Sequence, residues 1–217
     1  MKNNTKVSNF DDLIIDVCDI LSGGLMSKII LVTGGARSGK STFAEKLADK
    51  IHSESKNDLK HKAYIATAQI LDDEMAQRIK IHQARRDKEW HTFEAPFNAE
   101  LSIDAADEIA DVILFDCLTI YTSNFICAFD SLDDTDKIYF ELKTLVSKLI
   151  NAAEQINGTI IFVTNEVGSG IVPANKLSRV YRDCAGIANQ MIAAVADEVY
   201  MVVSGLAFDI KKIAINI

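Results

Sequence analysis

The sequence predicts an α/β protein with a mostly parallel central sheet flanked by helices, and two observations carry this prediction. Apolar runs rich in β-branched residues alternate along the chain with segments of helical periodicity, which is typical of parallel strands joined by helical crossovers. A glycine-rich segment directly follows the first of these runs, where α/β sheets hold phosphate groups. Strands are expected at residues 29–33, 63–67, 111–115, 159–164 and 198–203.

The first strand leads into residues 34–41, Gly-Gly-Ala-Arg-Ser-Gly-Lys-Ser, which match the pattern G-x-x-x-x-G-K-[ST] of a phosphate-binding loop. In this pattern Lys40 reaches the β- and γ-phosphates, and the Ser41 hydroxyl binds Mg²⁺. The helix predicted over residues 41–51 points its positive end at the phosphates. The fold is therefore predicted to be P-loop NTPase-like, the alternative being a turn that binds nothing. A side chain is expected to obstruct the turn at Gly34, Gly35 and Gly39.

The remaining helices are expected between the later strands. Residues 53–62, rich in Ser, Lys, Asn and Asp, predict a solvated loop, and His52 and His61 beside it are expected to be exposed. Helical periodicity covers residues 71–86, about 99–109, about 119–155 with a break near Ser131–Asp134, and 175–196.

Two polar segments follow buried strands at the edge of the sheet where ligands gather. Asp116, after Val112–Phe115, has the Walker B form and is expected to bind Mg²⁺; a plain turn-forming aspartate is the alternative. Residues 165–168, Asn-Glu-Val-Gly, follow the fourth strand and are expected near the same site, with an ordinary turn as the alternative.

His82 is the candidate nucleophile. Met75, Ile79 and His82 fall on one stripe of the predicted helix, which by itself favours a half-buried structural histidine. Cations surround it more densely than a structural histidine requires, and near a phosphate loop they favour transfer of a phosphoryl or nucleotidyl group to the imidazole. These cations are Arg78, Lys80, Arg85, Arg86 and Lys88.

Composition bounds the domain organisation and the partners. A chain of 217 residues suits one α/β core, so residues 26–217 are expected to form a single catalytic domain. Its net charge of −8 argues against nucleic-acid partners. Four cysteines without metal-binding spacing indicate reduced thiols and a cytoplasmic protein. No apolar run is long enough to span a membrane.

Residues 1–25 are expected to form an N-terminal extension, with a short amphipathic helix over Phe10–Leu21. Three alternatives are open for this segment: it packs on the core, it binds a partner, or it is a non-native extension.

Seven motifs together resemble the bifunctional adenosylcobinamide kinase/adenosylcobinamide-phosphate guanylyltransferase family of cobalamin biosynthesis. The resemblance runs in order and spacing from about Lys28 to Lys211, and the stretch Ala196–Gly205 is similar to that family too. The motifs lie at residues 33–41, 64–67, 70–75, 78–82, 116–119, 163–168 and 171–173.

This resemblance implies two reactions. A nucleoside triphosphate, ATP or GTP, first phosphorylates adenosylcobinamide with Mg²⁺; GTP then transfers GMP to an enzyme histidine, from which adenosylcobinamide phosphate takes it to form adenosylcobinamide-GDP. The family's histidine falls on His82, and Lys40 and Asp116 are the other catalytic positions. The resemblance also implies a homo-oligomer, with a trimer favoured. The positions that correspond to nucleotide contacts are Gly34, Gly35, Ala36, Arg37, Ser38, Gly39, Lys40, Ser41, Ala66, Thr67, Ala68, Gln83, Ala84, Arg85, Arg86, Glu94 and Asp116.

Two other functions compete with this interpretation. One is a P-loop kinase with a single activity, in which His82 is structural. The other is a nucleotide-dependent switch that binds a partner through residues 10–21.

Overall fold

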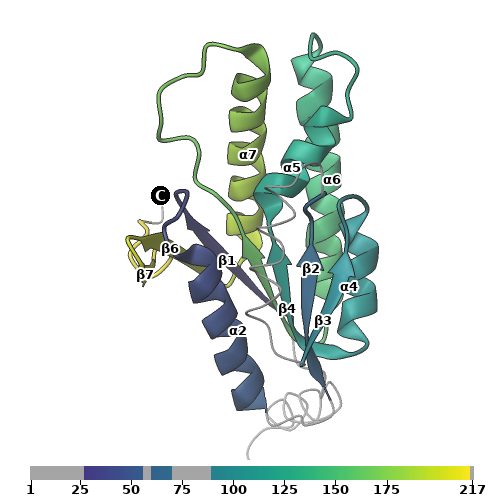
Figure 1. Ribbon diagram of the computed structural model, residues 1–217, viewed down its shortest axis with the longest axis vertical. Coiled ribbons are helices and arrows are strands. Elements are labelled where there is room, and N and C mark those ends of the chain that lie inside the picture. The colour runs from purple at the N-terminus through teal and green to yellow at the C-terminus, as the bar shows by residue number, and fades with distance from the viewer. Residues whose placement is uncertain (1–26, 56–59, 70–88, 216–217) are drawn as a thin grey trace, which may run out of the picture.

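A computed structural model describes residues 27–55, 60–69 and 89–215 of the chain (Figure 1). Within these residues the strands form one seven-stranded sheet in the order β3-β2-β4-β5-β1-β6-β7. Every neighbouring pair runs parallel except β6 and β7, which are antiparallel. The predicted α/β class with a mostly parallel sheet is confirmed.

The described elements alternate as the sequence indicates. In chain order they are β1 Lys28–Gly34, α2 Lys40–Ser55, β2 His61–Ala66, β3 Trp90–Glu94, α4 Ala99–Asp107, β4 Ala110–Asp116, α5 Leu118–Cys127, α6 Thr135–Gln155, β5 Thr159–Val163, α7 Lys176–Val195, β6 Glu198–Val203 and β7 Leu206–Asp209.

The five predicted strands correspond to β1, β2, β4, β5 and β6. The predicted break near Ser131–Asp134 is confirmed, because it separates α5 from α6. Two edge strands, β3 and β7, were not predicted. The helix expected over residues 71–86 and the extension expected over residues 1–25 lie outside the described residues.

The predicted solvated loop at residues 53–62 is wrong at both ends. Helix α2 continues through Ser55, and β2 begins at His61. The Lys62 side chain is buried, with its Nζ 2.7 Å from Asp49 Oδ1. The prediction that His52 is exposed is also wrong, since its side chain is only 18% exposed and its Nδ1 lies 2.7 Å from Asp111 Oδ1.

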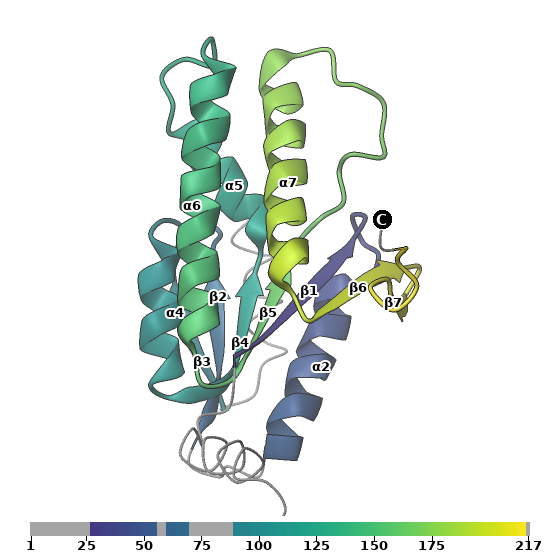
Figure 2. The ribbon, with the colours of Figure 1, turned by 180° about the vertical axis from the view of Figure 1, so that it is seen from behind.

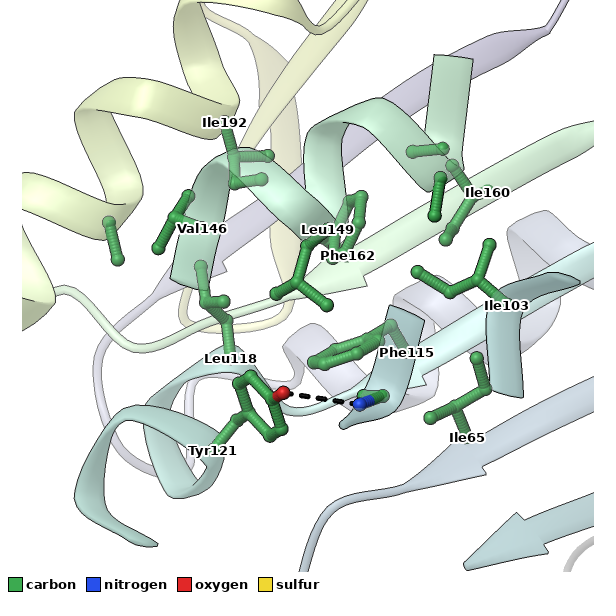
Figure 3. Close-up of a cluster of buried hydrophobic side chains, with 14 of the residues drawn as sticks. Ile65, Ile103, Phe115, Leu118, Tyr121, Val146, Leu149, Ile160, Phe162 and Ile192 are labelled. Atoms are coloured by element: carbon green, nitrogen blue, oxygen red, sulfur yellow. Dashed lines mark hydrogen bonds between the residues drawn. The ribbon is translucent and has the colours of Figure 1, made fainter. Parts of the chain in front are cut away.

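Helices cover both faces of the sheet (Figures 1 and 2). Alternate residues of β1 point to opposite faces: Ile29 and Leu31 join the core under α4 to α7, whereas Ile30 and Val32 pack with α2. Figure 3 shows the larger of these cores, where aromatic rings such as Phe115 and Phe162 meet aliphatic side chains of the helices.

Helix α6 illustrates how the sequence produces these layers. Its buried residues recur at helical spacing and form one apolar stripe, and each large aliphatic side chain on it contributes roughly 1.5–3 kcal/mol by burial. The Asp134 side chain caps the helix by accepting a hydrogen bond of 3.0 Å from the Lys137 N–H. The buried residues of α6 are Ile138, Leu142, Val146, Leu149, Ala152 and Ala153.

Candidate active site

The predicted phosphate loop connects β1 to α2 at the carboxyl edge of the sheet. Strand β1 ends at Gly34 and α2 begins at Lys40. The Ser38 N–H donates to the Gly35 carbonyl at 3.2 Å, and the Lys40 ammonium donates to the same carbonyl at 3.2 Å. Strand, loop and helix therefore follow one another as the motif requires.

Of the three glycines in residues 34–41, the protein itself requires the two that the pattern fixes. A Cβ on Gly34 would lie 2.4 Å from the Val202 carbonyl oxygen, and Gly39 has a φ of +95°. A Cβ on Gly35 would meet no protein atom within 4 Å among the described residues. The expected obstruction therefore holds for Gly34 and Gly39 and is wrong for Gly35.

Neighbouring segments hold the loop on both sides. Strands β5 and β6 flank β1, and a residue beyond each contacts the loop. The Glu166 N–H, after β5, donates to the Gly34 carbonyl at 3.1 Å. The Gly205 N–H, in the turn after β6, donates to the Ser38 carbonyl at 2.8 Å. The loop is thereby fixed to the sheet before any ligand binds.

Asp116 ends β4, which is separated from β1 by β5 alone. The Tyr64 hydroxyl donates to Asp116 Oδ2 at 2.8 Å and orients the carboxylate. Burial lowers the pKa of Lys40, while the neighbouring Asp116 carboxylate opposes that shift. Burial, followed by the nearby Asp116 carboxylate, raises the pKa of Cys117 to about 12, so this thiol stays protonated at neutral pH. The structure therefore brings Lys40 and Asp116 together.

The oxygen ligands at this edge suit Mg²⁺. Within the described parts of the chain, no group of three or more His, Cys, Asp or Glu side chains gathers as a protein-only metal site. Mg²⁺ is commonly held by one or two protein oxygens together with phosphates and waters. Ser41, in the first turn of α2, and Asp116 offer hard oxygen ligands of that kind.

The predicted positions on β2 and β3 form a row with Asp116. Ala66 is paired with Asp116 on one side and with Glu94 on the other. Thr67 has a structural role here: its fully buried hydroxyl donates to the Cys117 carbonyl at 2.9 Å and accepts from the Cys117 N–H at 2.8 Å. The side chain at this predicted nucleotide-contacting position is thus bound to the backbone that follows β4.

Sequence reasoning missed the partly buried polar network that supports the loop after β5. The Asn165 N–H donates to the Thr119 hydroxyl at 2.7 Å. The Thr164 hydroxyl donates to Asn189 Oδ1 at 2.7 Å, and Asn189 Nδ2 donates to the Asn165 carbonyl at 3.1 Å. An asparagine among the small and apolar residues of α7 was the available signal.

Comparison with known proteins identifies the family. The model of the family described as cobinamide kinase / cobinamide phosphate guanyltransferase (CobU) matches residues 30–210. The chain belongs to this family.

Three relatives support the same assignment. The bifunctional adenosylcobalamin biosynthesis protein CobU of Salmonella typhimurium is 43% identical over 84% of this chain and 99% of its own length. The Escherichia coli protein of the same name is 40% identical over the same shares of the two chains. The Pseudomonas aeruginosa protein CobP is 39% identical over 83% of this chain and 96% of its own length.

The family's candidate histidine and its neighbours, His82 to Arg86, lie outside the described residues. The chain has four histidines, and the other three lie away from the phosphate loop. His52 contacts Asp111 near the start of β4, and the rings of His61 and His91, at the amino ends of β2 and β3, are 4.5 Å apart. Among the helices of the described residues, none is long and apolar enough to cross a membrane.

Proposed function

We propose that this chain catalyses two successive reactions on adenosylcobinamide, in the manner of the bifunctional relatives. A nucleoside triphosphate phosphorylates the substrate hydroxyl, and GMP from GTP then passes through His82 to the new phosphate, giving adenosylcobinamide-GDP. The phosphate loop carries this proposal, because its backbone is fixed between the segments after β5 and β6, and Asp116 ends β4, which only β5 separates from β1. The named activities of the family supply the substrate class.

The residues of the proposed site have three different chemical roles: they bind phosphate, hold Mg²⁺ and attack GTP. The N–H groups of residues 34–41 and the Lys40 ammonium bind the phosphates and neutralise charge in the transition state. Ser41 and Asp116 would hold Mg²⁺, which supplies further charge neutralisation when bound. Neutral His82 attacks the α-phosphorus of GTP and expels pyrophosphate, after which the acceptor phosphate displaces the imidazole.

Covalent labelling tests the role of His82. The protein is incubated with Mg²⁺ and GTP labelled at the α-phosphate, quenched, and examined for label that is stable to base and released by acid. We expect label on wild type and none on His82→Ala. The control His91→Ala, which removes a histidine at the amino end of β3, should be labelled like wild type. His82→Ala is expected to retain kinase activity, because phosphorylation needs no histidine intermediate.

The possible outcomes separate the candidate functions. Label on folded His82→Ala, or equal loss of both activities in this variant, would contradict the assigned division of work. A folded wild type that binds GTP and phosphorylates the substrate without becoming labelled would instead be a kinase with a single activity.

We further propose that the protein is a cytoplasmic homo-oligomer, with three copies as the expected state. Its described surface carries exposed apolar side chains, among them Ile171 at 96%, Leu206 at 75% and Phe140 at 72% exposure. Association of copies through such side chains would remove their apolar area from water. Light scattering should give about three times the chain mass of 23.9 kDa, and a monomer at micromolar concentration would contradict this proposal.

A further inference from the structure

We propose that Glu166 is the general base of the phosphoryl-transfer step: its carboxylate accepts the proton of the substrate hydroxyl as that oxygen attacks the γ-phosphorus. This inference rests on the proposed kinase activity and assigns a residue that the phosphate loop and Asp116 leave unassigned. Three structural observations support it: the strand order, the contact of Glu166 with the phosphate loop, and the hydrogen bonds that fix the residue before it. The proton balance of the two reactions agrees with them.

The strand order places Glu166 between the two groups that handle phosphate. Strand β5 lies between β1, which leads into the phosphate loop, and β4, which ends at Asp116. Val163, the last residue of β5, is in register with Val32 of β1 and with Asp116 of β4. The segment that contains Glu166 therefore leaves the sheet between Lys40 with its loop and the candidate Mg²⁺ ligand.

Glu166 also contacts the loop directly. Its N–H donates to the carbonyl of Gly34, the first residue of the motif, at 3.1 Å. Its half-buried side chain turns back along the same segment, because Oε1 accepts a hydrogen bond of 2.6 Å from the Gly168 N–H. An ionised carboxylate has about four lone-pair sites, so this bond orients the group and leaves capacity to accept a substrate proton.

Polar side chains of α5 and α7 hold the segment from behind. Thr119 of α5 binds the Asn165 N–H, and Asn189 of α7 binds the Asn165 carbonyl, so both polar backbone groups of the residue before Glu166 are fixed. Thr164 is 1% exposed, and its hydroxyl is bound to Asn189. A base held by such a network keeps its position while the substrate binds.

The other carboxylates that end strands at this edge are less suitable bases. Asp116 is bound by Tyr64 and is the candidate Mg²⁺ ligand. Glu94 ends β3, which is four strand spacings from β1, or roughly 19 Å at ~4.8 Å per strand. Glu166 is adjacent to the loop itself.

The proton balance distinguishes the two reactions. In the kinase step the hydroxyl oxygen bonds to the γ-phosphorus, the bond from that phosphorus to the bridging oxygen breaks, and the nucleoside diphosphate leaves with that electron pair. The hydroxyl proton passes to a Glu166 carboxylate oxygen. In the final transfer of GMP the acceptor is a phosphate monoester, whose attacking oxygen carries no proton at neutral pH because its second pKa is about 6. A base at Glu166 therefore serves the kinase step alone.

The test compares Glu166→Gln with wild type in separate assays. The kinase assay follows phosphorylation of cobinamide by GTP; the transfer assays follow labelling of the protein by GTP and passage of GMP to cobinamide phosphate supplied ready-made. Glutamine keeps an oxygen for the Gly168 N–H and cannot take the proton. We expect kcat of the kinase to fall by roughly 10²–10⁴-fold and both transfer activities to stay within about threefold of wild type.

The split between kcat and KM provides a second readout. A base acts only in the transition state, so Glu166→Gln should lower kcat of the kinase while its KM for the substrate stays within about threefold of wild type. A kcat of Glu166→Gln within about threefold of wild type, or a loss that lies in KM instead of kcat, overturns the proposal in favour of a structural carboxylate. If Glu166→Gln does not fold, equal kinase rates in Glu166→Asp and Glu166→Ala overturn it. Absence of kinase activity from folded wild type is a different result, because it contradicts the proposed function itself.

Discussion

Gly34 and Gly35 are adjacent in the sequence, but the phosphate-loop pattern fixes glycine only at position 34. We expect Gly34→Ala to destabilise the fold by about 1–3 kcal/mol, because its Cβ would lie 2.4 Å from a carbonyl oxygen of β6 that the sheet holds in place. We also expect it to weaken nucleotide binding by displacing the loop. Urea denaturation and titration with GTP measure the two effects.

Gly35→Ala is the matched control. Its Cβ would meet no protein atom within 4 Å in the part of the chain that the structure describes, so the expected change in unfolding free energy is below about 0.5 kcal/mol. If the two substitutions destabilised the fold equally, the close contact with the Val202 carbonyl would not be the reason why position 34 needs glycine.

Residue type alone predicted the phosphate loop and Asp116, because each is read from a few contiguous residues. It did not predict Tyr64 as the partner of Asp116 or Asn189 as the support of Asn165, since 52 and 24 residues separate these pairs. The family resemblance places Thr67 among the nucleotide contacts, and residue type did not predict that its hydroxyl is bound to the backbone of Cys117. The role of His82 comes from the family resemblance, and labelling is its test.

At the scale of elements, the Thr67 hydroxyl links the end of β2 to the residue after β4. Removing this hydroxyl should therefore destabilise both strand ends. Thr67→Val leaves the buried N–H and carbonyl of Cys117 without this partner, and we expect a loss of about 2–4 kcal/mol in unfolding free energy. Thr67→Ser keeps the hydroxyl and should lose only about 1 kcal/mol through the missing methyl group. Denaturant unfolding compares the two, and a loss from Val no greater than that from Ser would mean that the hydrogen bonds are unimportant.

Burial explains which elements the sequence predicted. All five residues of β5 are buried, and such strands appear as continuous apolar runs. In the edge strand β3 only Trp90 and Phe93 are partly buried, so its five residues show no run. Strand β7 has four residues, none of them fully buried. The sequence did not predict the full length of α2 because the last turn of this helix is polar. His52 in that turn contacts Asp111, which lies far along the chain and could not be foreseen as its partner.

At the scale of the whole molecule, the phosphate loop is bound by segments that lie far apart in the sequence. Glu166 follows β5, Gly205 follows β6, and both donate backbone hydrogen bonds to residues 34–38. A ligand that binds this loop therefore acts on the central strands of the sheet rather than on a peripheral segment. Binding should thus appear as a shift of the main cooperative unfolding transition.

We expect GTP at one hundred times its dissociation constant to stabilise the fold by about 2.7 kcal/mol. For a chain of this size that corresponds to an increase in Tm of roughly 5–10 °C, and thermal unfolding followed by circular dichroism measures it. Lys40→Ala should unfold near the wild-type temperature without ligand and show no increase at the same GTP concentration, because the ammonium that reaches the phosphates is absent. An equal increase in the two proteins would mean that GTP binds elsewhere, since linkage requires that only a ligand bound to the folded state raises its stability.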